Sequence, residues 1–173
     1  MHMLHLLRHA KSSWKEGVDD RERGLNRRGR ESARQVGRHL TASVGALDLV
    51  LCSSSRRTRE TLELVFDELP VRPHSMIEDE LYAASREELI NRLRHLTEGS
   101  GSVLLIGHNP GLHELAVALA DTNSAGFRKL ESGKFPTAAR ASFRIPDPWS
   151  ALGRSQYELV DYVTVQSLQR DKD

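Results

Sequence analysis

The residue pair Arg8-His9 directly follows an apolar run that begins at Met3. Parallel α/β sheets bind their ligands at the carboxyl ends of their strands, so a buried strand that stops on an arginine and a histidine predicts a site at its end. The same dipeptide occurs twice more in the sequence, both times within patterns that predict helices. Because only the first copy follows a strand, we interpret Arg8 and His9 as catalytic residues.

Two further apolar runs end in polar clusters of the same kind. Residues 47–51 lead into Cys52 and then into three serines and two arginines over residues 53–57. Residues 102–106, the clearest buried strand of the chain, lead into Gly-His at 107–108. Since parallel strands bring their carboxyl ends to one edge of a sheet, we expect the polar groups to converge there. The expected pocket contains Arg8, His9, Arg57 and His108.

Two arginines and two histidines in one pocket suit a phosphoryl group. Guanidinium groups bond phosphate oxygens in pairs, and an imidazole can attack phosphorus to form a covalent intermediate. Gly107 and Gly111 allow backbone N–H groups and a helix N-terminus to approach an anion. The arginines can also neutralise the charge on the equatorial oxygens, so we expect the chemistry to require no metal and no cofactor.

Four motifs, taken together and in order, resemble the histidine phosphatase superfamily and specifically its small SixA-type phosphohistidine phosphatases. They are Leu-Arg-His-Ala-Lys-Ser-Ser-Trp at 7–14, Arg-x-Leu-Asn-x-x-Gly at 23–29, Ser-x-x-x-Arg-x-x-x-Thr at 53–61 and Gly-His-Asn-Pro-Gly at 107–111. The resemblance spans nearly the whole chain, from Met3 to about Phe143. Two residues depart from the pattern: Ser54 stands where proline usually follows the serine, and Ala10 stands where the wider superfamily has glycine.

The resemblance implies a role for each matching residue. His9 is implied to be the nucleophile that becomes phosphohistidine, and the other members of the phosphate pocket are Arg8, Arg57 and His108. Ser53 aligns with the serine that opens its motif and is assigned to the same phosphate pocket.

One residue is a candidate general acid. The large insertions that carry substrate and acid residues in the sugar-phosphate mutases of this superfamily are missing from this chain. Glu80, in the carboxylate-rich segment 78–80, remains as a candidate, and a solvated loop is the alternative interpretation of that segment.

The expected reaction has two steps, in which His9 attacks phosphorus in line and water then releases phosphate from His9. We expect Arg8, Arg57 and a charged His108 to lower the pKa of His9, so that the nucleophile is neutral at pH 7. The expected activity is dephosphorylation of phosphohistidine in proteins. Two alternatives stay open: a phosphomonoesterase for a small phosphorylated metabolite, and a non-catalytic module that binds phosphohistidine or phosphopeptides. A binding module would need no nucleophile at position 9.

Cysteine-phosphatase chemistry fits the spacing less well. That class uses Cys-x5-Arg, in which five residues separate the cysteine from the arginine. Here the residue at that spacing from Cys52 is Thr58, and Arg57 comes one position too early. The remaining histidines have no spacing typical of a metal site, so no metal is expected. A single cysteine also excludes an internal disulfide framework and suits a reducing cytoplasm.

The elements that must position these residues follow from apolar periodicity. Strands are predicted at 3–7, 47–51, 102–106, 139–145 and 157–165, with an edge strand in 71–77 because proline at 73 argues against a central one. Helices are predicted after Asn26, over 62–69, from Ser85 and over 112–119. Residues 11–25 and 121–136 are predicted as loops, and the tail from Gln169 as frayed. This alternation predicts an α/β three-layer sandwich with a mostly parallel sheet and helices on both faces, forming one domain over 1–173.

The charge distribution and the length of the apolar runs limit the classes of partner that this protein can bind. The net charge is +1, and arginines alternate with acids, as in residues 19–23, so no one-sided basic face for nucleic acid is expected. No apolar run approaches the ~18 residues that span a bilayer. We therefore expect a soluble cytoplasmic protein that acts on a phosphorylated protein or small phosphorylated substrate, without nucleic acid or membrane as partner. The oligomeric state is left open.

Overall fold

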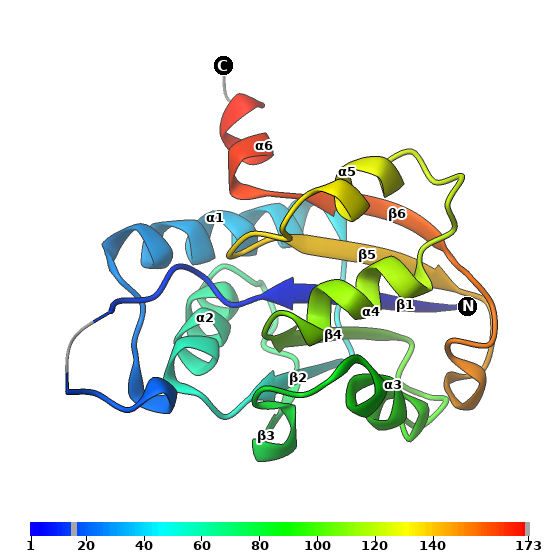
Figure 1. Ribbon diagram of the computed structural model, residues 1–173, viewed down its shortest axis with the longest axis horizontal. Coiled ribbons are helices and arrows are strands. Elements are labelled where there is room, and N and C mark those ends of the chain that lie inside the picture. The colour runs from blue at the N-terminus through cyan, green and yellow to red at the C-terminus, as the bar shows by residue number, and fades with distance from the viewer. Residues whose placement is uncertain (15–16, 172–173) are drawn as a thin grey trace.

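A six-stranded sheet forms the centre of the molecule (Figure 1). The computed structural model describes residues 1–14 and 17–171. In spatial order the strands are β3 (His74–Glu78), β2 (Leu49–Ser53), β4 (Ser102–Gly107), β1 (His2–Arg8), β5 (Arg140–Ile145) and β6 (Glu158–Val163). The first four pair in parallel, and β5 runs antiparallel to both of its neighbours.

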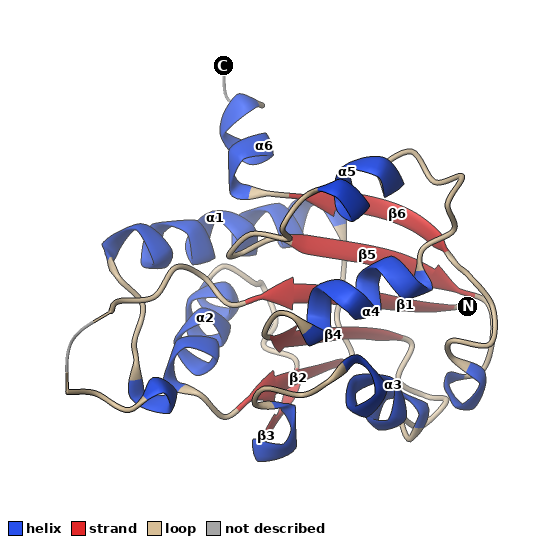
Figure 2. Cartoon of the chain, in the orientation of Figure 1, coloured by secondary structure: helices blue, strands red, loops and turns tan. Residues whose placement is uncertain are grey.

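Helices cover both faces of the sheet (Figure 2). On one face lie α1 (Arg27–Ser43), α2 (Arg56–Asp67) and α6 (Val165–Arg170), and on the other lie α3 (Arg86–Arg94), α4 (Gly111–Leu119) and α5 (Phe127–Ser132). Each set of helices closes its own hydrophobic core against the sheet. The predicted three-layer α/β sandwich is confirmed.

The central strand β4 explains why two cores exist. Val103 and Leu105 face the core under α3 and α4, whereas Leu104 and Ile106 face the core under α1 and α2, and all four are fully buried. A parallel strand covered on both faces needs such a continuous apolar run. Polar side chains can therefore begin only where the strand ends.

Strand register brings three strand ends to the same edge. Arg8 pairs with Gly107, and Cys52 pairs with Ile106. In Figure 1 the arrowheads of β1, β2 and β4 point to the same side of the molecule. The polar residues that follow the three strands consequently meet at this side.

Local capping residues start three of the helices, and those of α1 and α3 are the ones that the sequence predicts. The Asn26 side chain accepts a hydrogen bond from the Gly29 N–H at 2.8 Å, and Ser85 and Glu88 form a capping box at α3. Ser55 caps α2 and so sets the position of Arg57 in its first turn.

Several predicted boundaries are wrong. Ser55 starts α2 at Arg56, so this helix spans Arg56–Asp67 and not the predicted 62–69, and the predicted strand 157–165 ends at Val163. The predicted loop 121–136 contains α5, which is held by the fully buried Leu130 but is too short to show an apolar period. The predicted frayed tail begins inside α6, which a capping box at Thr164 starts and the buried Leu168 anchors. β2 begins and ends two residues later than predicted, at Leu49–Ser53.

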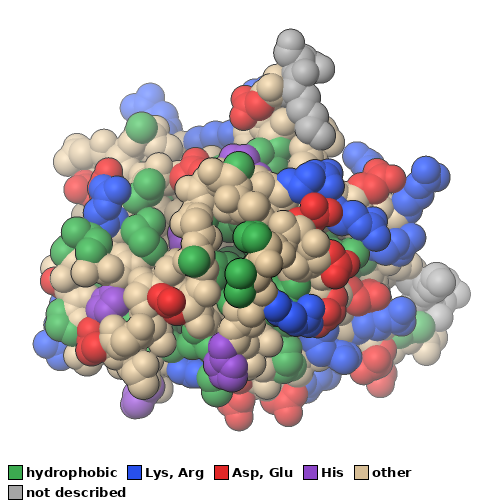
Figure 3. Space-filling model, turned by 180° about the vertical axis from the view of Figure 1, so that it is seen from behind, with side chains coloured by type: hydrophobic (Ala, Val, Ile, Leu, Met, Phe, Trp, Pro, Cys, Tyr) green, Lys and Arg blue, Asp and Glu red, His purple; other side chains and the backbone are tan. Residues whose placement is uncertain are grey.

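Charges on the face of α1 and α2 are mixed. Arg27 pairs with Glu31 at 3.4 Å along α1, and Arg38 of α1 pairs with Glu68 at 3.3 Å. Figure 3 shows basic and acidic side chains interspersed on this rear face. The interleaving agrees with the expected absence of a one-sided basic face there. None of the helices in the described residues is long and apolar enough to cross a membrane.

Candidate active site

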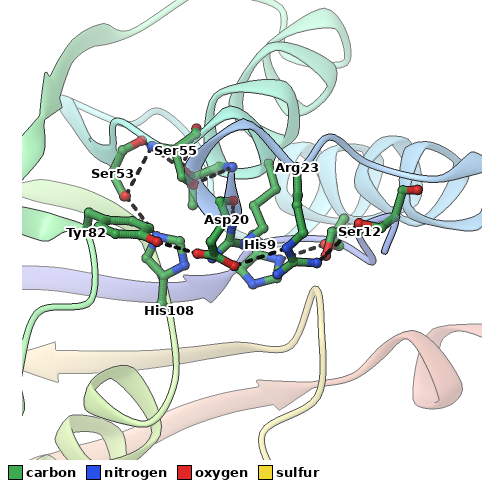
Figure 4. A network of polar contacts seen from close by, with 12 residues as sticks. His9, Ser12, Asp20, Arg23, Ser53, Ser55, Tyr82 and His108 are labelled. Atoms are coloured by element: carbon green, nitrogen blue, oxygen red, sulfur yellow. Dashed lines mark hydrogen bonds and ion pairs between the residues drawn. The ribbon is translucent and has the colours of Figure 1, made fainter. Parts of the chain in front are cut away.

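The four side chains predicted to converge line one cavity of about 400 Å³. They are Arg8, His9, Arg57 and His108. The ring centroids of His9 and His108 lie 5.4 Å apart, which is close enough for both imidazoles to contact one phosphoryl group. Figure 4 shows these two rings together with a network of polar side chains beside them.

His9 is held in one tautomer by its own backbone. Its Nδ1 lies 2.7 Å from the carbonyl oxygen of Ala10, and because a carbonyl only accepts, Nδ1 carries the hydrogen. The Ala10 N–H in turn donates to Thr61 Oγ1 at 3.0 Å, which fixes this turn against α2. The neutral ring therefore has its lone pair on Nε2, which leaves this atom free to act as a nucleophile.

Burial keeps His9 neutral. The pKa of His9 is lowered to about 3, mainly by desolvation and to a smaller extent by His108, Arg8 and Arg57, against a hydrogen bond to Ala10 that raises it. The predicted direction of the shift is confirmed. The predicted charge on His108 is wrong, because burial and Arg57 lower the pKa of His108 to about 4 and leave it neutral at pH 7.

We expect NMR to find the His9 ring neutral at pH 5. Ring ¹⁵N shifts should report a protonated Nδ1 and an unprotonated Nε2, whereas an unperturbed histidine with a pKa near 6.5 would be almost wholly charged at that pH. A His9→Asn variant identifies the signal. Titration of this ring near pH 6.5 would contradict the assignment.

Asp20 is a site residue that the sequence did not identify. It lies in the short 3₁₀ helix η1 (Asp20–Glu22), and Arg57 donates to its backbone oxygen at 2.7 Å and to its Oδ2 at 3.0 Å. Tyr82 donates its hydroxyl hydrogen to the same carboxylate, and Arg23 donates to Oδ1 at 3.0 Å. The bonds from Tyr82, Arg57 and Arg23 lower the pKa of Asp20 far below its usual range, so this carboxylate is ionised.

Asp20 also explains how a buried cation is tolerated at the start of α2. Arg57 is only 6% exposed, and a cation at a helix N-terminus is unfavourable without an anion nearby. The Asp20 carboxylate supplies that anion at Nη2 of Arg57, and the Asp20 backbone oxygen accepts from Nη1. Figure 4 shows Asp20 among the site residues. In the sequence, Asp20 stands in an interleaved run of charges that is typical of solvated loops, and only the folded loop distinguishes it.

Arg23 is a second residue that was not assigned a role. Its Nη1 donates to Ser12 Oγ at 2.8 Å and to the Ser13 carbonyl at 3.3 Å. Its guanidinium carbon lies 3.7 Å from the ring centroid of the exposed Trp14, and both residues line the cavity. Arg23 opens the second of the four motifs, so the sequence held a signal for it.

Ser53 lies at the site through His108. Its buried hydroxyl is 2.8 Å from His108 Nε2 and accepts from the Ser55 N–H at 3.4 Å. A hydroxyl that accepts from Ser55 can donate its hydrogen to Nε2, which places the hydrogen of His108 on Nδ1. Ser53 thus orients the ring of His108.

Several buried donors near His9 have no partner among the described residues. They are Nε of Arg8, Nε of Arg57 and, in the tautomer that Ser53 favours, Nδ1 of His108. A buried donor without a partner costs about 1–3 kcal/mol. An anion with several oxygens, such as a phosphoryl group, would satisfy all of them at once.

The candidate acid Glu80 lies away from this cavity. It is exposed on the 3₁₀ helix η2 (Asp79–Leu81), does not line the cavity, and its charge acts on Arg92, which binds Glu78 at 2.7 Å. Tyr82, two residues further on, reaches the site instead, with its ring centroid 5.4 Å from that of His108 and the two rings nearly perpendicular.

Cysteine and metal chemistry have little support in the described residues. Cys52 is fully buried in β2, and desolvation raises the pKa of its thiol to about 12, so the thiolate is not available at pH 7. Within residues 1–14 and 17–171, no three histidine, cysteine or acidic side chains cluster as a metal site would require.

Comparisons with known proteins give the same family. A model of the histidine phosphatase superfamily (branch 1) matches residues 4–81. An uncharacterised protein of Mycobacterium leprae is 33% identical over 162 residues, which cover 90% of this chain and 98% of that protein.

Two solved structures share the fold over most of their length. A candidate phosphohistidine phosphatase SixA from Nakamurella multipartitia has a TM-score of 0.83 at 26% identity, over 94% of this chain and 95% of that one. Another from Agrobacterium tumefaciens has a TM-score of 0.79 at 28% identity, over 94% of this chain and 97% of that one. The similarity extends beyond the residues that the family model matches.

Proposed function

This chain belongs to the histidine phosphatase superfamily, and from that premise we propose that it dephosphorylates phosphohistidine in proteins through a covalent intermediate on His9. Membership of the family implies a phosphatase that acts on a phosphorylated substrate. The observation that carries the finer proposal is the free lone pair on Nε2 of a neutral His9 beside three unpaired buried donors.

In the first step, His9 Nε2 attacks phosphorus in line as the bond from phosphorus to the substrate's imidazole nitrogen breaks. Arg8, Arg57 and the Nδ1–H of His108 bond the three phosphoryl oxygens and offset their charge. Asp20 holds both Nη atoms of Arg57, which orients the guanidinium and leaves its Nε for the phosphoryl group.

In the second step, water attacks the phosphorus on His9 and inorganic phosphate leaves. The bond from His9 Nε2 to phosphorus breaks, and a proton from the water passes to solvent. His9 returns to the neutral tautomer that Ala10 holds.

Leaving-group chemistry favours a substrate with a phosphorus–nitrogen bond over one with a phosphorus–oxygen ester bond. An imidazole can leave already protonated, whereas an alkoxide needs a positioned acid, which typically contributes about 10²- to 10⁴-fold. Asp20 is ionised, and Glu80 lies outside the cavity, so neither supports ester hydrolysis.

We expect a phosphohistidine peptide to be hydrolysed about 10²-fold or more faster than the matching phosphoserine peptide, because no carboxyl group lines the cavity among the described residues and the ester needs an acid. The test measures phosphate release from each peptide by the parent protein and by Glu80→Gln. For each peptide, the variant should have the same rate as the parent. Faster hydrolysis of phosphoserine that is lost in Glu80→Gln would identify an ester phosphatase with Glu80 as its acid.

A further inference from the structure

A second, larger cavity adjoins the catalytic one. It encloses about 560 Å³, against about 400 Å³ for the cavity at His9, and lies within the range of about 300–1,000 Å³ typical of ligand sites. Lys11 and Thr137 line both cavities, so the two form one continuous depression. The larger part, which we call the basic groove, is further lined by α1, by the end of β6 with α6, and by α5 with the loop that follows it.

The basic groove is strongly positive. Its charged lining residues are Lys11, Arg28, Lys129 and Lys134, and no carboxylate of the described residues lines it. None of the four forms an ion pair within the described part of the chain, although many other arginines do. In a chain of net charge +1, this is a local excess of positive charge beside the catalytic cavity.

Lysine is concentrated in this groove. The sequence has five lysines against twenty arginines; Lys15 and Lys172 lie outside the described residues, and the other three line the groove. A lysine ammonium is a compact charge on a flexible stem, whereas an arginine presents a rigid fork that matches phosphate. The arginines of the catalytic cavity therefore suit one phosphoryl group in fixed geometry, and the lysines suit carboxylates in variable positions.

The wall of the groove is tied to the catalytic residues. Asn109 Nδ2 donates to the carbonyl oxygens of Lys134 and Phe135 at 3.1 and 2.9 Å, and Arg8 Nη1 donates to the Phe135 oxygen at 3.4 Å. The Ala138 N–H donates to the His9 oxygen at 3.0 Å. This loop lies beside the end of β1 in Figure 1, so the backbone that carries Lys134 is held close to His9.

We propose that the basic groove binds an acidic segment of the protein substrate while the phosphorylated side chain enters the cavity at His9, an inference that rests on the proposed function. Charge complementarity selects carboxylates, and continuity through Lys11 and Thr137 places them next to the phosphorylated residue. The groove then selects phosphoproteins by the acidic residues near the modified histidine.

Binding can be measured without any turnover. The probe is a fluorescent glutamate-rich peptide without phosphate, and the variants are Lys129→Gln/Lys134→Gln and, as a control that removes the same charge, Arg34→Gln/Arg154→Gln. Both control arginines are exposed and lie outside the groove lining. We expect the lysine variant to bind the peptide about tenfold more weakly and the control to bind it like the parent, since exposed ion pairs contribute up to about 1 kcal/mol each. Equal affinity in all three proteins, or tighter binding of single-stranded RNA than of the peptide, would overturn the proposal.

Kinetic measurements distinguish a failure of this inference from a failure of the proposed function. With phosphohistidine peptides flanked by glutamate, the lysine variant should show a KM about tenfold higher and an unchanged kcat. With glutamine in place of each glutamate, parent and variant should have the same KM. If the parent hydrolyses neither peptide but the groove binds the glutamate probe as expected, the phosphohistidine assignment fails and the acidic-ligand site remains.

Discussion

Replacing His9 with alanine is expected to lower kcat by about 10⁴-fold or more and to abolish labelling of the protein by a phosphorylated substrate. His9 is the nucleophile that we propose at the end of β1, and its Nε2 lone pair is set by the bond from Nδ1 to Ala10. In the parent protein, a phosphoryl group on histidine should be labile in acid and stable in base. The measurements are phosphate release and trapping of the labelled protein on rapid quenching.

His95→Ala is the matched control, because Arg94-His95 repeats the same dipeptide at the end of α3, where His95 is exposed. This variant should keep full activity and labelling. Cys52→Ala should keep its activity per folded molecule, since burial holds that thiol protonated. Loss of activity in Cys52→Ala with survival of activity in His9→Ala would show that the nucleophile is wrongly assigned.

Arg57→Ala is expected to lower kcat/KM by about 10³-fold, the range observed when an arginine that stabilises a transferring phosphoryl group is removed. Its guanidinium is held by two bonds to Asp20, so Arg57 is already oriented before the substrate binds. Arg57→Lys should recover only part of this loss, because an ammonium cannot bond Asp20 and a phosphoryl oxygen through one planar group. Steady-state kinetics on a phosphohistidine peptide measures both effects.

Arg56→Ala is the control for Arg57, because Arg56 precedes it in the same helical turn but lies on the surface and pairs with Glu60 at 3.6 Å. We expect this variant to change kcat/KM by less than about twofold, as exposed ion pairs contribute little. Thermal melting of each variant shows whether it is folded. A folded Arg57→Ala protein with parental kcat/KM would exclude Arg57 from phosphoryl binding.

The order of the layers and the edge of the sheet that holds the candidate site can be predicted from the amino-acid sequence. Apolar runs buried on both faces predict central parallel strands, and such strands end together, so Arg8, His9, Arg57 and His108 could be placed in one cavity without coordinates. Capping residues such as Asn26 were also readable, because they act on the backbone only three residues away.

Only the tertiary structure identified the residues that complete the site from loops. Asp20 and Tyr82 are 62 positions apart, and neither lies in a periodic segment, yet their side chains meet beside Arg57. The basic groove likewise joins α1 to the loop after α5, and short elements such as α5 have no apolar period that could have placed them.

The protonation states were also decided by the fold. Residue type gave the expectation that charged neighbours lower the pKa of His9, but burial is the largest cause, and it also leaves His108 neutral. Periodicity and capping depend on near neighbours in the chain and can be read from the sequence. Desolvation, tautomer and ion pairing depend on which distant atoms surround a group, and the folded chain alone determines them.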